Sequence, residues 1–123
     1  MSAASTPRPI RSPAELAQAQ LEAYNRKDLE AFCACYSEDV KVWHPPEPEP
    51  RLSGMAAFRA RYAAGPFAQP AVRAEVSQRL VLPEMVVDHE VVHGRGDTPH
   101  ELAVVYRCRE GLIAEVFFFT QPA

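Results

Sequence analysis

Residues 106–120 read YRCREGLIAEVFFFT, and this stretch decides the fold. Two runs of alternating character flank Glu110-Gly111, a dipeptide that suits a tight turn between antiparallel strands. A two-residue turn at this point predicts a hairpin and fixes which side chains lie opposite each other. The predicted pairs are Arg109 with Leu112, Val105 with Val116, and Ala103 with Phe118.

The same alternation extends upstream through most of the second half of the chain. Period-two patterns predict strands at 74–82, 85–93, 99–109 and 112–120. Short polar, glycine or proline segments separate these ranges, so consecutive strands should form antiparallel hairpins. The sequence therefore predicts a four-stranded antiparallel sheet.

The first half of the chain has helical signals instead. Ser12, followed by a proline and then Glu15, forms the pattern of a capping box and predicts a helix start. Asp28 caps a second predicted helix, and Ser53-Gly54 precedes a third that ends at Gly65-Pro66. A short strand at 40–43 and a proline-rich loop lie between the second and third helices. Helices followed by strands indicate an α+β fold in which the helices cover one face of the sheet.

Length and composition limit the class of protein. A chain of 123 residues builds one core, so we expect one domain over 12–123 after a loose tail at 1–11. The net charge is -3 and the basic residues are scattered, which predicts no nucleic-acid partner. No apolar run reaches the roughly 20 residues of a membrane span, so no membrane partner is expected. Three cysteines fit a cytoplasmic location and indicate neither a disulfide framework nor a metal site.

Both faces of the last hairpin are apolar, which is unusual for the sheet of a monomer. We therefore expect a homodimer through the sheet face that the helices leave uncovered. The length of the connection between the strands at 85–93 and 99–109 decides which of their side chains face the helices. A connection of four residues, 94–97, predicts one set of inward-facing side chains, and a connection one residue longer exchanges the inward and outward sets. The predicted inward set is Asp88, Glu90, Glu101, Val105, Val116 and Phe118, with His89 and His93 on the opposite face beside Leu102 and Phe119.

Aromatic and ionisable residues supply candidate site positions. Tyr24, Trp43, Phe58 and Tyr62 form either an aromatic wall around a flat ligand or part of the core. His44 is either a general base in the pocket or the residue that enters the proline-rich loop. No cofactor or metal ion is predicted, because no phosphate loop or metal-ligand spacing is present.

Two segments carry a family resemblance: AYNRKDLEAF at 23–32 and YRCREGLIAEVF at 106–117. With the order of predicted elements, the chain resembles the nuclear transport factor two-like superfamily over about residues 13–120, in its SnoaL-like and ketosteroid-isomerase-like branch. The resemblance implies a cone-shaped curved mixed sheet wrapped by three N-terminal helices, which is a cystatin-like α+β roll, and it implies a pocket and frequent dimers. Members include isomerases, polyketide cyclases, dehydratases, hydrolases and non-catalytic binders, so the fold leaves the chemistry open.

Ketosteroid isomerase combines an aspartate base with an oxyanion hole of a tyrosine and a protonated aspartate. By similarity, the base position corresponds to His44, the tyrosine position to Gln20 and the second acid to Val105. A neutral imidazole accepts a proton near neutral pH, so base chemistry is retained in principle. Both oxyanion donors are altered or missing.

These observations predict a small hydrophobic-ligand-binding protein, with the chemistry of a cofactor-independent isomerase, cyclase or dehydratase. His44 or Asp88 would move a proton next to a carbonyl group. The predicted substrate-binding residues are Gln20, Tyr24, Trp43, Phe58, Tyr62, Glu90, Val105 and Phe118. The alternatives are a non-catalytic ligand-binding or dimerisation module, and association with another protein through the sheet face.

Overall fold

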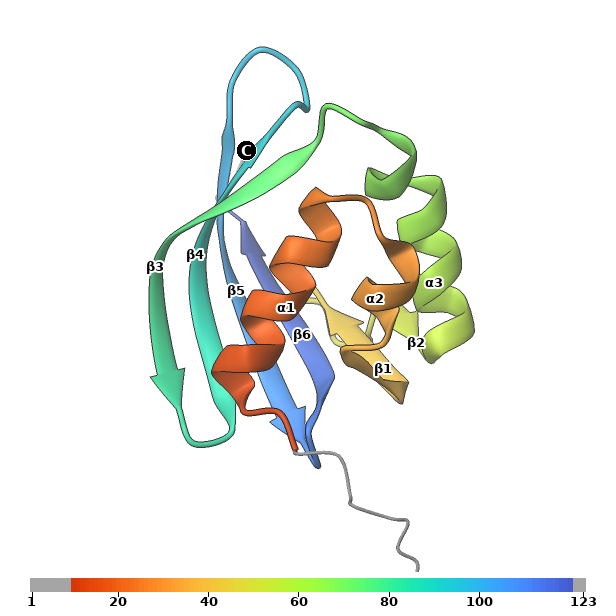
Figure 1. Cartoon of the computed structure of the whole chain (residues 1–123), viewed down its shortest axis with the longest axis vertical. Helices are drawn as coiled ribbons and strands as arrows, with labels where there is room; N and C mark the ends of the chain where they lie inside the picture. The colour runs from red at the N-terminus through yellow and green to blue at the C-terminus, as the bar shows by residue number, and fades with distance from the viewer. Residues whose placement is uncertain (1–9, 121–123) are drawn as a thin grey trace, which may run out of the picture.

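The computed structural model describes residues 10–120 (Figure 1), so nearly all of the predicted tail at 1–11 lies outside the described residues. The helices are α1 (Pro13–Asn25), α2 (Leu29–Cys33), α3 (Met55–Ala64) and the short 3-10 helix η1 (Pro66–Ala68). The strands are β1 (Tyr36–Trp43), β2 (Leu52–Ser53), β3 (Arg73–Leu82), β4 (Met85–His93), β5 (His100–Arg109) and β6 (Leu112–Thr120).

One mixed sheet contains all the strands of residues 10–120, in the order β2-β1-β6-β5-β4-β3. β1 runs parallel to β6, whereas the remaining neighbours are antiparallel. The sheet is curved, and α1, α2 and α3 lie on its concave side (Figure 1). This arrangement confirms the predicted α+β class. β2 and η1 were not predicted, because two or three residues are too few to show a period.

The capping box at the start of α1 is confirmed. Ser12 Oγ accepts a hydrogen bond from the backbone N–H of Glu15 (3.1 Å), and the Glu15 carboxylate accepts one from the Ser12 N–H (2.8 Å). At the other end, Asn25 Oδ1 accepts from the N–H of Ala74 (2.8 Å) while its Nδ2 donates to the Ala74 carbonyl (2.9 Å). Both ends of α1 are thereby fixed, and one end is tied directly to β3.

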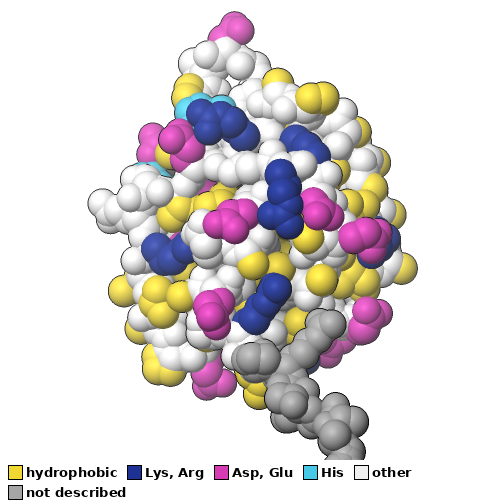
Figure 2. All heavy atoms as spheres, in the orientation of Figure 1, with side chains coloured by type: hydrophobic (Ala, Val, Ile, Leu, Met, Phe, Trp, Pro, Cys, Tyr) yellow, Lys and Arg dark blue, Asp and Glu magenta, His cyan; other side chains and the backbone are white. Residues whose placement is uncertain are grey.

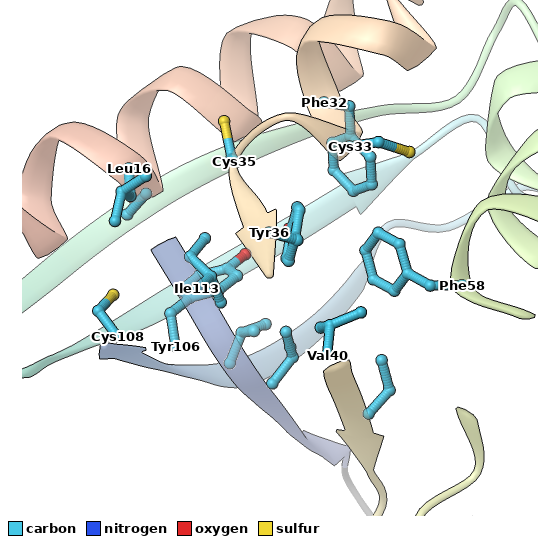
Figure 3. Close-up of a cluster of buried hydrophobic side chains, with 14 of the residues drawn as sticks. Leu16, Phe32, Cys33, Cys35, Tyr36, Val40, Phe58, Tyr106, Cys108 and Ile113 are labelled. Atoms are coloured by element: carbon cyan, nitrogen blue, oxygen red, sulfur yellow. The ribbon is translucent and has the colours of Figure 1, made fainter. Parts of the chain in front are cut away.

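Aromatic side chains from three elements fill the space between the helices and β1. Phe32, Tyr36 and Phe58 come from α2, β1 and α3 and point toward one another (Figure 3). The rings of Phe32 and Phe58 stack with centroids 5.7 Å apart, and those of Tyr36 and Phe58 lie 4.5 Å apart. This cluster packs the Tyr36 ring firmly, so its hydroxyl has a defined position for the site described below.

The predicted register of β4 against β5 is wrong by one residue. Glu90 pairs with Leu102 instead of Glu101, and Asp88 pairs with Val104 instead of Ala103. The connection runs from 94 to 99, longer than the four residues assumed, and the shift reverses the faces of β5. The even-numbered residues of β5 therefore face the helices, and the odd-numbered ones, Glu101 and Val105 among them, belong to the outer face.

The predicted β5–β6 register is correct beside the turn and wrong beyond it. Arg109 lies opposite Leu112, but Val105 lies opposite Phe117 and Ala103 opposite Phe119. The register shifts between Arg107 and Cys108, because Ala114 is an extra residue in β6 and forms a bulge. A bulge reverses the alternation of side chains beyond it. The missed bulge in β6 therefore cancels the wrong register of β5 against β4, and Val116 and Phe118 lie on the same side as Asp88, as predicted.

Charges of both signs are interspersed over the helical face in Figure 2, with no large area of one sign. This surface agrees with the scattered basic residues of the sequence. Among the helices of residues 10–120, none has the length and apolar character that crossing a membrane requires.

The β4–β5 connection supplies a test of backbone packing with a matched pair of glycines. Gly94 and Gly96 both have positive φ (+89° and +91°), but a Cβ on Gly94 would lie 2.1 Å from the Ala71 carbonyl oxygen, while one on Gly96 meets nothing within 4 Å. Both alanine substitutions incur the left-handed strain of about 1 kcal/mol. We expect Gly94→Ala to lower the free energy of unfolding, measured with urea, by at least about 3 kcal/mol, because the backbone at Ala71 must also move. Equal losses in the two variants would contradict the close approach.

Candidate functional site

A cavity of about 630 Å³ lies between the helices and the inner face of the sheet. α1 contributes Gln20, Leu21 and Tyr24, and α3 contributes Arg61 and Tyr62. The sheet contributes both apolar side chains and an acid, namely Val42, Val92, Leu102, Phe118 and Glu90. Polar groups are more prominent in this lining than the sequence predicted.

A chain of hydrogen bonds joins four buried polar side chains of the lining. The Tyr36 hydroxyl donates to Gln20 Oε1 (3.1 Å), and Gln20 Nε2 donates to the Tyr106 hydroxyl (3.0 Å). The Tyr106 hydroxyl in turn donates to Glu90 Oε2 (3.1 Å). Elements that are far apart in sequence therefore converge on one carboxyl group, and each link fixes the orientation of the next.

Glu90 is the ionisable centre of this chain. Burial raises its pKa to about 7, although the hydrogen bond from Tyr106 opposes the rise; the negative charge of Asp88 adds to it, and Arg79 opposes it. Only 8% of Glu90 is exposed. A carboxyl group with a pKa near 7 exchanges protons readily at neutral pH, which suits general acid or base chemistry.

The second oxygen of Glu90 faces the cavity. Within residues 10–120, Oε2 has the Tyr106 hydroxyl as partner, whereas no hydrogen bond reaches Oε1. Every fully buried side-chain oxygen in that range has a hydrogen-bond partner. Because Oε1 has none, it is not fully buried and is accessible to solvent. Because Glu90 lines the cavity, Oε1 is the atom that a bound molecule can reach.

His44 follows β1 and also lines the cavity. Its ring stacks on Phe118 with centroids 5.3 Å apart and is half-buried. Burial lowers the pKa of His44, and the positive charges of Arg51 and Arg61 lower it further, although Glu47 opposes them. The imidazole is therefore neutral at pH 7 and able to accept a proton.

Asp88 lies on the inner face of β4, but it is not part of the cavity lining. Its side chain is fully buried and accepts two hydrogen bonds from Arg79, at 2.7 Å from Nε and 3.0 Å from Nη2. Arg79 Nη1 also donates to Gln18 Oε1 of α1 (2.9 Å). This ion pair occupies both carboxylate oxygens, so the position gives no support to the predicted catalytic role, which stays a prediction.

Five of the predicted substrate-binding residues line the cavity: Gln20, Tyr24, Tyr62, Glu90 and Phe118. The other three do not. Trp43 donates its Nε1–H to Glu115 (3.0 Å) and stacks on Phe117, a residue of the outer face. Phe58 is fully buried in the aromatic core, and Val105 lies on the outer face because of the register shift.

Tyr106 is the main site residue that the sequence analysis misplaced, since the predicted register puts it on the outer face together with Leu102. A signal for its true orientation was present: Arg107 and Arg109 flank Cys108, and charged side chains alternate outward. This alternation puts Tyr106 and Cys108 inside, where both are buried. The register predicted from the turn includes no bulge and therefore gives Tyr106 the opposite orientation.

No group of three histidine, cysteine, aspartate or glutamate side chains within residues 10–120 could hold a metal ion. The three cysteines are buried and unbonded. Burial raises the pKa of each thiol, to about 11 at Cys108. These thiols are therefore protonated at neutral pH and behave as core residues.

Solved structures share the fold at low identity. An uncharacterised cystatin-fold protein from Novosphingobium aromaticivorans is 23% identical with a TM-score of 0.77, over 88% of this chain and 97% of the other. A putative ketosteroid isomerase from Kribbella flavida is also 23% identical, with a TM-score of 0.74 over 88% and 76%. A computationally designed 17-OHP binder is 20% identical, with a TM-score of 0.78 over 90% and 92%.

A search of curated proteins found no match to this sequence. A family model described as a SnoaL-like domain matches residues 17–116, which span α1 to β6 and include Gln20, Glu90 and Tyr106. That match covers well over half of the chain and agrees with the fold. The chain therefore belongs to the SnoaL-like domain family, within the nuclear transport factor two-like superfamily.

Proposed function

We propose that the protein binds a small, partly apolar molecule in its cavity and moves a proton to or from it with Glu90. The observation that carries the proposal is a carboxyl group of raised pKa with one oxygen held by Tyr106 and the other facing the cavity. Proton transfer next to a carbonyl group, as in an isomerase or cyclase, uses a group of this kind. His44 remains the second candidate for the proton carrier.

The surroundings of Glu90 define where an oxyanion could be stabilised. Gln20 stands at the position of an oxyanion donor by similarity, but both hydrogens of its amide are used, by the Ala17 carbonyl (3.0 Å) and the Tyr106 hydroxyl (3.0 Å). A carbonyl oxygen must therefore receive its hydrogen bond elsewhere. Glu90 in its protonated form supplies an O–H donor inside the cavity, and His44 in its neutral form then accepts the proton.

A non-catalytic binder is the second candidate function. The occupied amide of Gln20 favours it, because a site without a free donor beside the acid stabilises an oxyanion poorly. The designed 17-OHP binder shares this fold, which supports the use of such a cavity for binding alone. The two candidates differ in whether a bound carbonyl compound exchanges its protons.

The pH dependence of folding tests the raised pKa of Glu90. Below about pH 4.5 the carboxyl is protonated in both folded and unfolded chains; between 4.5 and about 7 only the unfolded chain releases its proton, so stability falls as pH rises. We expect Glu90→Gln to remove this loss and to gain about 2 to 3 kcal/mol on wild type between pH 4.5 and 8. Tyr106, Asp88 and Arg79 affect the pKa of Glu90 directly. The charge of Glu90 in turn raises the pKa of Tyr24, Tyr36, Tyr62 and Tyr106, which surround it.

Urea unfolding of both proteins at several pH values measures this difference. Glu49→Gln is the matched control, since it makes the same chemical change at an exposed position of the proline-rich loop that does not line the cavity. Parallel pH profiles for wild type and Glu90→Gln would show that Glu90 ionises normally.

Exchange of α-protons tests the catalytic part of the proposal. We expect wild type to accelerate hydrogen–deuterium exchange of 2-tetralone in D₂O, followed by NMR, and Glu90→Gln to lower the enzymatic rate by about 100-fold or more. A parallel His44→Gln measurement separates the two proton carriers by the size of each loss. Glu49→Gln again serves as control. Binding of 2-tetralone without any acceleration would favour the non-catalytic alternative.

We also propose that the protein is a homodimer through the outer face of the sheet. Val87, Val91 and Val105 are only half-buried there, and Phe119 is 44% exposed. The helices of residues 10–120 lie on the other side (Figure 1). Two acids of this face contact histidines: Glu101 contacts His89 Nε2 (2.7 Å) and Glu75 contacts His93. A second copy related by a twofold axis would cover these partly exposed apolar side chains.

The mass of the protein in solution tests the dimer. Sedimentation equilibrium should give twice the chain mass of 13.7 kDa, and Val105→Glu should weaken association by about 100-fold because it places a charge in the contact. Ala60→Glu, on the exposed side of α3, should leave the mass unchanged. A wild-type monomer at tens of micromolar would refute the proposal.

A further inference from the structure

The charged side chains around the cavity are unequal in sign. Three arginines line it, Arg51, Arg61 and Arg95, against two acids, Glu90 and Glu101; Glu101 belongs to the outer face but lies near the start of β5, where it also borders the cavity. They come from the segment before β2, from α3 and from the β4–β5 connection, so separate parts of the chain bring positive charge to one opening. Each of the three arginines is exposed, which places them toward the solvent side of the cavity.

Two of these arginines have no acidic partner. Among residues 10–120, the Arg51 guanidinium makes two hydrogen bonds with Glu47, at 2.9 and 2.6 Å, but no carboxylate forms an ion pair with Arg61 or Arg95. The acids of the lining do not compensate them, since Glu101 contacts His89 and Glu90 is held by Tyr106. The excess positive charge at the opening is thus centred on Arg61 and Arg95.

The positive charges of Arg61 and Arg95 act on the same part of the cavity lining. Burial raises the pKa of Tyr62, and the positive charges of Arg95 and Arg61 both oppose that rise. Burial likewise raises the pKa of Tyr24, and the positive charge of Arg95 opposes that rise. The two guanidinium groups therefore act from different elements on neighbouring tyrosines of one wall.

We propose that the molecule bound in the cavity is an amphipathic anion, with its apolar body against Tyr24, Tyr62 and Leu102 and its acidic head group between Arg61 and Arg95. This proposal rests on the cavity being a binding site, as proposed above, and adds the chemical class of its occupant. A planar guanidinium binds a carboxylate, sulfonate or phosphate oxygen pair with strong charge-assisted hydrogen bonds. The adjoining apolar wall reduces the competition from water and strengthens those bonds.

A pair of fluorescent probes that differ in one group tests the proposal directly. 8-Anilino-1-naphthalenesulfonate carries a sulfonate, and N-phenyl-1-naphthylamine has the same aromatic body without it. We expect the sulfonate probe to bind wild type about tenfold more tightly, and the preference to diminish as salt is raised from 20 to 500 mM. Fluorescence titration of each probe gives both dissociation constants.

Arginine variants locate the head group. Arg61→Gln and Arg95→Gln should each weaken the sulfonate probe about fivefold to tenfold and leave the neutral probe unchanged. Arg59→Gln is the matched control on α3, because Arg59 pairs with Glu30 and does not line the cavity. Leu102→Trp, which fills the cavity, should abolish binding of both probes and so show where they bind.

The outcomes separate this inference from the proposed function. Equal affinity for both probes, or loss of the sulfonate preference in Arg59→Gln alone, overturns the anionic occupant while the cavity remains a binding site. Absence of binding by either probe, or binding that survives Leu102→Trp, overturns the occupant and leaves the cavity itself without support as a ligand site.

Discussion

Two carboxyl groups on one strand must be accommodated beneath the helices, and much of the structure follows from that constraint. Asp88 and Glu90 are alternate residues of β4, so both face the interior. A buried carboxylate is costly without compensation. Asp88 is compensated by direct hydrogen bonds from the guanidinium of Arg79, whereas the hydrogen bond that Glu90 accepts within residues 10–120 comes from the Tyr106 hydroxyl. The unequal surroundings of these two acids separate a structural ion pair from a group able to exchange protons.

The general architecture was predictable because it depends on many residues at once. The caps of the helices and the alternation of four strands each involve several side chains, so one misread position changes little. The orientation of β5 depends instead on two single features, the length of the 94–99 connection and the bulge at Ala114. Neither has a strong sequence signal, and for that reason Val105 and Tyr106 were assigned to the wrong faces.

The candidate site was only partly predictable for a related reason. Glu90 was predicted because the acids of β4 stand out among apolar neighbours, and Gln20 because of the family resemblance. The hydrogen bonds that join them through Tyr106 connect residues up to 86 positions apart in the chain. Sequence spacing carries no information about such contacts until the sheet order is known, and the parallel pairing of β1 with β6 brings Tyr36 into the same chain of bonds.

The bulge in β6 has a consequence for how this chain can diverge. Because the alternation of a strand reverses at an extra residue, Ile113 and Val116 both face inward although they lie three positions apart. Loss of Ala114 would bring them two positions apart and restore a regular strand with both side chains still inward. A single deletion is thus acceptable at Ala114, whereas a single insertion or deletion elsewhere in β6 reverses the faces of the residues beyond it unless a second bulge compensates. The hairpin can therefore change its length by one residue at the bulge, and the 94–99 connection, being exposed, can also absorb single residues as long as the offset of its strands is kept.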